Sequence, residues 1–209
     1  MKKILFLGLA VTFCSMADLC DDEYEKYKLN WDKDSTLTIC KDALKGDPEA
    51  QFDLAGIYSQ DEKNYEAAFE WTRKSAAQGC SKSQYVLGLM YYNGFGIDTN
   101  WFYAFELFEK ASKKNLPHAM TSLGFMYQHA QVKPKNVNKA KELYVKAAKL
   151  GDPSAFNLLG EMYLKGDGID IDIEKAATYF VDGINSITKT LLSDDKNTYP
   201  CNIYNDSND

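Results

Sequence analysis

The sequence of 209 residues contains a single arginine, Arg73, and carries a formal net charge of −6. Proteins that bind nucleic acids carry clustered Lys and Arg side chains, which neutralise phosphates and release their counterions. This acidic chain has no such cluster. The composition therefore excludes nucleic acids and anionic membrane surfaces as partners.

Histidine is also scarce, and the signatures of catalysis are missing. The two histidines, His118 and His129, would lie roughly 16 Å apart on one helix, so they cannot share a metal ion. Nucleophile-elbow, P-loop and zinc-protease motifs are absent. Ser-x-x-Lys occurs at residues 186–189 and 193–196, but without the Ser-Asp-Asn and Lys-Thr-Gly elements of a serine β-lactamase. We therefore predict no cofactor, no metal and no enzymatic activity.

The N-terminal apolar run, Ile4–Phe13, is short. It covers about ten residues, whereas a helix needs roughly 20 to span a bilayer. The run follows a Lys-Lys pair and precedes Ser15-Met16-Ala17, whose small residues fit the site that signal peptidase reads. We predict a signal peptide at residues 1–17, cleaved after Ala17, and a product in a bacterial periplasm or outside the cell. Cleavage would take the charge from −6 to −8, because this segment contains two lysines and no acidic residue.

Four cysteines remain after such a cleavage: Cys20, Cys40, Cys80 and Cys201. None belongs to a Cys-x-x-Cys pair, and an even number in an exported chain predicts disulfides with three possible connectivities. Cys20 and Cys40 flank a predicted turn at residues 30–35, so an antiparallel hairpin would bring them together. Cys80–Cys201 then follows by elimination. Free buried thiols are the alternative.

The dominant positive feature of the sequence is a repeat. Leu-Gly-x-x-Tyr begins at Leu87, Leu123 and Leu159, in steps of 36 residues, and a related Leu-Ala-x-x-Tyr copy begins at Leu54. A fixed period of this length predicts a solenoid of helical hairpins, each made of a helix A, a loop and a helix B. Small residues recur where two helix backbones must approach closely, and large residues fill the space beside them.

The pattern resembles the SEL-one-like repeat family, a relative of the tetratricopeptide repeats. The resemblance covers roughly residues 48–187. It rests on the Ala-x-x-x-Leu-Gly-x-x-Tyr core, on the loops Gly94–Ile97 and Gly166–Ile169, and on Lys146-Ala147-Ala148-x-x-Gly151. It implies an all-α fold, a right-handed α-α superhelix of about four hairpins. The first copy lacks the Gly-x-Gly loop, and the third replaces it with residues 129–132.

The repeat boundaries give the expected domain plan. We expect a signal peptide at 1–17, an N-terminal helical cap at 18–47, repeats at 48–80, 81–116, 117–152 and 153–192, and a polar tail at 193–209. The cap should contain helices at 18–29 and 36–44. The repeats should contain helices near 48–59, 63–78, 81–92, 99–114, 117–129, 136–150, 153–165 and 172–190.

Aromatic residues are the main candidates for the repeat core. We predict equivalent packed positions for the tyrosines that end each Leu-Gly-x-x-Tyr pattern, which are Tyr91, Tyr127 and Tyr163. We also interpret Trp71, Trp101 and Phe102 as core residues, because aromatic side chains bury large apolar areas.

The resemblance further implies that helix A lines the concave face of the stack. Positions just outside the repeat pattern would then point into a groove. The predicted partner-binding set is Phe52, Tyr85, Leu89, Tyr92, Asn93, Phe125, Gln128, His129 and Glu161. We expect Tyr85, Tyr92 and Phe125 as anchors, with Glu161 and His129 on the rim. The alternative is that these side chains only fill the inner wall of a tight superhelix.

We therefore predict an exported, non-enzymatic module that binds a protein or peptide partner in this groove. Two other functions stay open. One is a periplasmic immunity protein that neutralises a toxic effector, since an acidic chain suits a basic toxin surface. The other is a hydrolase of β-lactam or cell-wall substrates, which would depend on Ser186.

Overall fold

The computed structural model of the protein describes residues 20, 33–60, 64–192 and 201. Within these ranges every regular element is a helix: α2 (Lys33–Lys45), α3 (Pro48–Tyr58), α4 (Tyr65–Ala77), α5 (Ser81–Asn93), α6 (Trp101–Lys113), α7 (Pro117–Gln128), α8 (Val137–Lys149), α9 (Pro153–Lys165) and α10 (Ile173–Leu192). Each predicted repeat helix is present within two residues of its expected ends, which confirms the all-α prediction. The expected signal peptide, the helix at 18–29 and the tail lie outside the described residues, except for Cys20 and Cys201.

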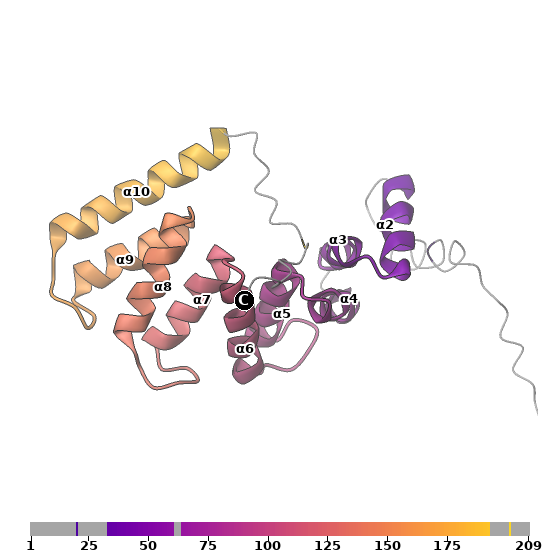
Figure 1. The fold of residues 1–209 in the computed structure, drawn as a ribbon, viewed down its shortest axis with the longest axis horizontal. Coiled ribbons are helices and arrows are strands. Elements are labelled where there is room, and N and C mark those ends of the chain that lie inside the picture. The colour runs from indigo at the N-terminus through magenta and orange to yellow at the C-terminus, as the bar shows by residue number, and fades with distance from the viewer. Residues whose placement is uncertain (1–19, 21–32, 61–63, 193–200, 202–209) are drawn as a thin grey trace, which may run out of the picture.

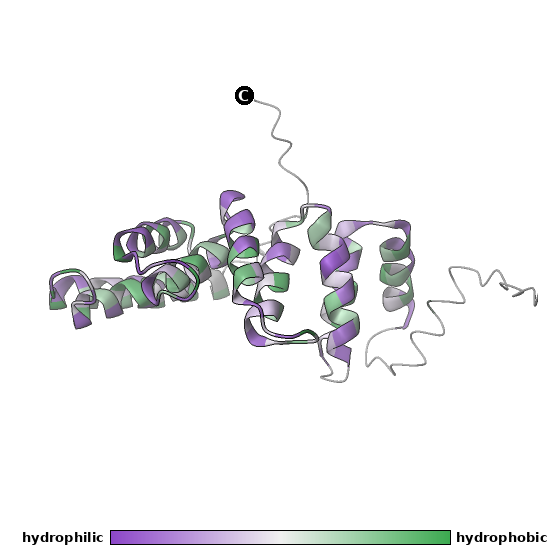
Figure 2. Cartoon of the chain, turned by 90° about the horizontal axis from the view of Figure 1, so that it is seen from below, coloured by the Kyte–Doolittle hydropathy of each residue, from purple (hydrophilic) through white to green (hydrophobic). Residues whose placement is uncertain are grey.

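The helices stack in chain order, from α2 at one end to α10 at the other (Figure 1). The pairs α3–α4, α5–α6, α7–α8 and α9–α10 form four hairpins, and α2 packs against α3. Hydrophobic and hydrophilic residues alternate along the helices (Figure 2). Because each hairpin buries its apolar side against its neighbours, the core runs along the stack rather than around one centre.

The repeat tyrosines fix the start of helix B in the second, third and fourth repeats. The carbonyl oxygens of Tyr91, Tyr127 and Tyr163 accept hydrogen bonds from the backbone N–H groups of Asn100, Asn136 and Asp172, at 2.7, 2.9 and 3.0 Å. The side chains of Asn100, Asn136 and Asp172 in turn cap α6, α8 and α10. Each accepts a hydrogen bond from the backbone N–H three residues further on. The repeat tyrosine and the capping Asn or Asp that bonds to it thus tie the end of helix A to the first turn of helix B.

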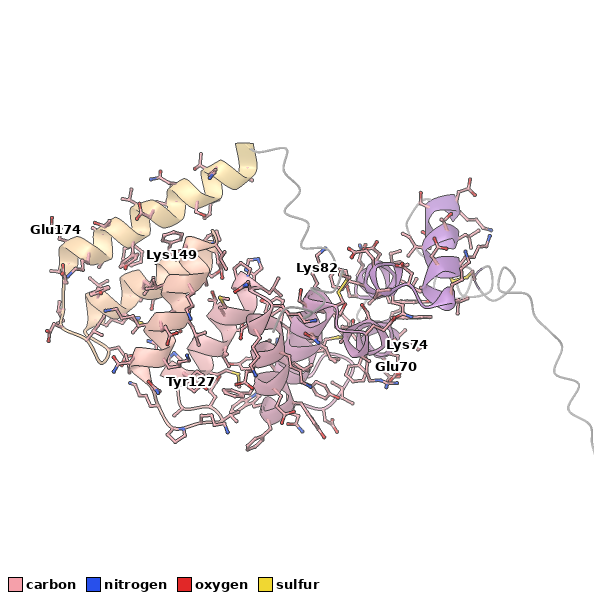
Figure 3. The ribbon with its side chains drawn as sticks, viewed as in Figure 1. Glu70, Lys74, Lys82, Tyr127, Lys149 and Glu174 are labelled. Carbon is pink, nitrogen blue, oxygen red and sulfur yellow. A yellow bond between two sulfur atoms is a disulfide. The ribbon has the colours of Figure 1, made fainter. Side chains whose placement is uncertain are left out.

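The tyrosine rings also pack at equivalent places. The rings of Tyr127, which is labelled in Figure 3, and Phe105 pack edge to face, with their centroids 5.4 Å apart. The same contact recurs one repeat earlier. One repeat later the equivalent residue is Lys141, whose Nζ lies 5.0 Å from the centre of the Tyr163 ring. The tyrosines therefore occupy equivalent packed positions, each partly buried.

Two disulfides, Cys20–Cys40 and Cys80–Cys201, join cysteines whose Cα atoms lie 5.9 and 4.3 Å apart (Figure 3). Glu49 accepts a hydrogen bond from the backbone N–H of Cys201 at 2.7 Å, so this distant residue contacts both ends of the first repeat. Both pairs have the connectivity that the sequence suggested, and they are compatible with an exported protein. None of the helices in the described residues is long and apolar enough to cross a membrane.

Candidate functional site

Three cavities of about 320 Å³ each lie along the A helices, and we call this row the groove. The first lies between α3, α4 and α5. The second lies between α5, α6, α7 and α9, and the third between α7 and α9. Leu89 lines both the first and the second cavity, while Phe125 and Leu158 line both the second and the third. Neighbouring cavities therefore adjoin, and the row extends across all four repeats.

Eight of the nine predicted partner-binding residues line the groove. Phe52, Leu89 and Asn93 line the first cavity; Leu89, Tyr92 and Phe125 the second; Phe125, Gln128, His129 and Glu161 the third. The remaining residue, Tyr85, lies behind the wall, with its ring 5.7 Å from that of Phe108 and 6.0 Å from that of His118. Burial raises the pKa of the Tyr85 phenol, although a hydrogen bond with Ser122 opposes this shift. Tyr85 thus supports the groove rather than lining it.

The second cavity has mostly apolar walls, and one of its aromatic side chains is held on two sides. The Tyr92 ring stacks on Trp101 with centroids 6.0 Å apart, and its hydroxyl accepts a hydrogen bond from Gln131 Nε2 at 2.7 Å. The indole N–H of Trp101 donates to the Tyr92 carbonyl oxygen at 3.3 Å. Because these contacts fix its orientation, Tyr92 presents an ordered surface to the cavity.

The third cavity is the polar end of the groove. Glu161 pairs with Lys165 at 2.6 Å, and Asp167 pairs with Lys135 at 2.7 Å. The hydrogen bond from Lys135, followed by one from Gln128, holds the pKa of Asp167 below its usual value. The apolar wall of this cavity comes from Phe125, whose ring centroid lies 4.2 Å from that of His129. A partner would meet charged side chains here and apolar ones in the second cavity.

Gln128 has a structural use that the sequence did not reveal. Its amide nitrogen donates to Asp167 at 2.8 Å, and its amide oxygen accepts from the hydroxyl of Tyr144 at 2.8 Å. Burial raises the pKa of Tyr144, so the phenol stays protonated and able to donate. Gln128 therefore joins α7, α8 and the loop that follows α9, and both ends of its amide already have partners.

A buried carboxylate supports the second cavity from behind. Asp152 caps α9 by accepting the Ser154 N–H at 3.1 Å, and its other contacts are with Thr121 Oγ1 and with His118 Nδ1, the latter at 3.3 Å. Burial alone would raise the pKa of Asp152, but the hydrogen bonds from His118 and Thr121 lower it overall. Conversely, the hydrogen bond to Asp152 raises the pKa of His118 against the effect of its own burial. The pair links the first turn of α7 to the N-cap of α9.

The interpretation of Trp101 and Phe102 as core residues is wrong. Trp101, Phe102 and Tyr103 are all exposed, and Phe102 is 70% exposed. The reason is position: Phe102 lies in the first turn of a helix B, and the equivalent residues 36 and 72 positions later are Asn138 and Glu174. Those polar equivalents were the signal that this position faces solvent. Trp71, by contrast, packs against the core of the first repeats.

The sequence reasoning missed one set of groove residues, those directly before each repeat leucine. Val86, Ser122 and Leu158 occupy this position in successive repeats, and each lines a cavity of the groove. The same 36-residue period could have identified them. The contact between Trp101 and Tyr92 was not predicted either, because it depends on how the loop after α5 folds.

The residues considered for catalysis have structural contacts. Ser186 Oγ donates to the carbonyl oxygen of Gly151 at 3.0 Å, which fastens α10 to the turn before α9. His118 pairs with Asp152, and His129 lies against Phe125. In the part of the chain that the structure describes, no group of three or more His, Cys, Asp or Glu side chains could hold a metal ion.

A family model for the Sel1 repeat matches residues 48–80, 81–116, 117–152 and 153–180. The chain belongs to the Sel1 repeat family. The resemblance noted in the sequence is thereby confirmed. Sel1 repeat proteins generally mediate protein–protein interactions and are typically non-enzymatic scaffolds, and the comparisons indicate no catalytic family.

Solved structures of other Sel1 repeat proteins share this fold. A Sel1 repeat protein from Oxalobacter formigenes is 25% identical with a TM-score of 0.67, over 81% of this chain and 69% of that one. A protective antigen of uropathogenic Escherichia coli with an SLR fold is 25% identical with a TM-score of 0.68, over 81% of this chain and 38% of that one. A Sel1 repeat protein from Klebsiella pneumoniae is 20% identical with a TM-score of 0.51, over 84% and 87%. No curated protein matched the chain.

Proposed function

We propose that this Sel1 repeat protein is an exported, non-enzymatic binding module that holds a segment of a protein partner in the groove. One observation carries the proposal: three adjoining cavities follow four consecutive repeats, and large apolar side chains line them without being fully buried. Contiguous apolar patches with polar rims are typical of interaction sites. Tyr92 and Phe125 are the anchors of this proposal.

The groove favours a partner segment with apolar and polar parts in a set order. Leu89, Tyr92 and Phe125 would accept apolar side chains in the second cavity. Glu161 and Lys165 would then contact polar or charged groups in the third. Because the two ends differ in chemistry, a bound segment would have one preferred direction along the groove.

A binding measurement with matched variants tests this proposal. A partner captured by the wild-type chain would be purified, and its affinity measured by calorimetry for the wild type and for Tyr92→Ala/Phe125→Ala. We expect a loss of about 30-fold or more, because truncating a central aromatic anchor costs at least about 2 kcal/mol. Leu150→Ala is the control, since Leu150 is exposed on the chain but lines none of the three cavities.

Two results would overturn the groove proposal. One is undiminished binding by Tyr92→Ala/Phe125→Ala when circular dichroism shows an intact helical fold. The other is an equal loss in Leu150→Ala, which would mean that the measured contact does not depend on the groove. Tyr85 is left out of the variant because its packing against Phe108 would confound folding with binding.

The export part of the proposal is supported by the two cysteine pairs, because disulfides persist in oxidising compartments. The net charge of −6 favours a basic partner, and one such partner would be a toxic effector that the protein neutralises. A gene for such an effector beside this one would favour the inhibitor. If an inhibitor contacts its effector through another surface, Tyr92→Ala/Phe125→Ala will bind the effector as tightly as the wild type does. If it uses the groove, the same variant will weaken that binding.

A further inference from the structure

The first cavity occupies the same place in its repeat as the second cavity does in the next repeat. Five residues that line the second cavity have equivalents, 33 or 36 positions earlier, that line the first. These pairs are Leu89 and Gly56, Tyr92 and Ser59, Phe108 and Thr72, Ser122 and Val86, and Phe125 and Leu89. The two cavities are therefore copies of one site, and they differ in the side chains that line it.

Three of these positions carry much smaller residues in the first cavity. Gly56 has no side chain, and a Cβ atom there would meet nothing within 4 Å. The hydroxyl of Ser59 donates to the carbonyl oxygen of Gly56 at 2.8 Å, so it is held against its own helix. Thr72 is buried, and its hydroxyl donates to the carbonyl oxygen of Ala68 at 2.7 Å. The first repeat thus leaves room at a site that the second repeat narrows with larger side chains.

The second repeat shows which chemical group suits this place. There the ring of Tyr92 stacks on Trp101, with centroids 6.0 Å apart and an angle of 24° between the ring planes. The residue equivalent to Trp101 is Tyr65, which lines the first cavity. Because Ser59 takes the position of Tyr92, the first repeat supplies one ring of this stacked pair but not the other. An aromatic ring from another molecule would contact Tyr65 as Tyr92 contacts Trp101.

A second wall of this place is also present in the first cavity. The ring of Tyr92 is held by Gln131 as well, and the residue equivalent to Gln131 is Phe95. Phe95 lines the first cavity, and its ring centroid lies 5.3 Å from that of Tyr65. The loop that carries Phe95 is packed tightly on Tyr65, because a Cβ atom on Gly96 would collide with the carbonyl oxygen of Tyr65. Since these walls are already held in place, they would lose little freedom when a ligand binds.

We propose that the first cavity binds an aromatic side chain of the partner, in the place that Tyr92 occupies in the second repeat. The cavity has a volume of about 320 Å³, and the rings of Phe52, Tyr65 and Phe95 line it. Aromatic rings pack favourably against one another, which favours an aromatic side chain over an aliphatic one of similar size. Leu89 lines both this cavity and the second, so one partner segment can reach both. This aromatic anchor rests on the groove function proposed above, and it specifies which kind of residue the partner places at this end.

The test uses a small probe, N-acetyl-phenylalanine methylamide, and does not require the partner. Amide NMR spectra of the isotope-labelled chain, recorded during a titration up to about 20 mM probe, would locate and quantify binding. We expect a Kd of roughly millimolar size, with the largest shifts at Gly56, Ser59 and Leu89. N-acetyl-leucine methylamide should bind about threefold to tenfold more weakly, because it lacks the ring.

Ser59→Tyr should block the cavity, because it supplies the ring that the second repeat has. We expect the affinity for the probe to fall about tenfold or more, since a tethered ring competes at high effective concentration. Thr178→Tyr is the matched control: Thr178 is exposed, its hydroxyl donates to a carbonyl oxygen of its own helix at 2.9 Å, and it lines none of the three cavities. Gly56→Leu is a second blocking variant, which places the leucine of the second repeat in the cavity if Ser59→Tyr disturbs folding.

A titration without binding would overturn the proposal, as would shifts centred on the second cavity. Equal or tighter binding of the leucine compound would also overturn it, and so would probe binding that persists in the folded Ser59→Tyr and Gly56→Leu variants.

The partner's affinity distinguishes this proposal from the groove function. If Ser59→Tyr leaves that affinity unchanged while Tyr92→Ala/Phe125→Ala weakens it, the groove function stands and the aromatic anchor is wrong. If the probe binds as expected but Tyr92→Ala/Phe125→Ala binds the partner as tightly as the wild type does, the groove function is wrong and the first cavity remains a site for an aromatic ring.

Discussion

The ring of Tyr144 packs directly on the backbone of Gly124, so closely that a Cβ atom on Gly124 would lie 2.7 Å from Tyr144 Cε1. The same relationship joins helix B to helix A in the neighbouring hairpins, at Gly88 and Gly160. In the first repeat the glycine is replaced by Ala55 and the aromatic residue by Thr72. Side-chain volume at this contact is therefore shared between the two helices, and a larger residue on one requires a smaller residue on the other.

Gly124→Ala should destabilise the protein by about 1–3 kcal/mol, because the added methyl group overpacks against Tyr144. Gly56→Ala should have the opposite sign and stabilise by about 0.5–1 kcal/mol, since alanine is favoured over glycine within a helix. A Cβ on Gly56 would meet nothing within 4 Å. Urea denaturation measures both changes. Equal signs for the two variants would contradict this account of the repeat glycine.

Ala130→Gly should stabilise the protein by about 0.5–1 kcal/mol, because alanine pays a steric cost in the left-handed region. Ala130 has φ 54°, and the equivalent residues in the second and fourth repeats, Gly94 and Gly166, have φ 80° and 68°. The third repeat thus keeps the helix-ending conformation without the glycine that suits it. The control is Gly94→Ala, which should lose stability in the same denaturation assay; a gain there would argue against the steric explanation.

The stability contributed by His118 should fall as the pH rises. Its pKa is raised in the folded state by Asp152, so the contribution is complete below the unfolded pKa of about 6.5 and disappears above the folded value. The effect should stay below about 1 kcal/mol, since the side chain is half exposed. Denaturation between about pH 6 and 8.5 should show this decline in the wild type. His118→Gln should flatten it, and an unchanged slope would exclude His118 as its source.

The two disulfides should differ in their effect on stability. Opening Cys80–Cys201 should cost more than opening Cys20–Cys40, about 5 against about 3 kcal/mol, because it closes a longer loop in the unfolded chain. Double Ser variants of each pair, compared by thermal denaturation, measure the difference. Intact mass and non-reducing peptide mapping of exported protein check the pairing and a start at Asp18. Reduced, full-length protein would contradict both disulfides and export.

The sequence by itself determined the repeat and much of the groove. Leu87, Leu123 and Leu159 set a period, and every helix A side chain at one height in that period lies on one line of the stack. Because the family resemblance placed helix A on the concave face, the 36-residue spacing then put Leu89 and Phe125 in one groove. The equivalent residues Asn138 and Glu174 also held the signal that Phe102 faces solvent, although aromatic character was the feature first weighed.

The tertiary structure decided which of those residues are free to act. Tyr85 and Gln128 sit at positions that the period assigns to the groove, but Tyr85 packs behind it and Gln128 has both ends of its amide bonded. The exposure of Ile184 on α10 likewise depends on which part of the chain lies next to it. Its position in the repeat does not decide this, because the equivalent residue Ala148 is buried. The repeat period predicts on which side of its helix a side chain lies, because that side depends only on the residue's position in the helix. The residues that pack against the side chain come from other repeats and differ from copy to copy, so only the folded chain shows them.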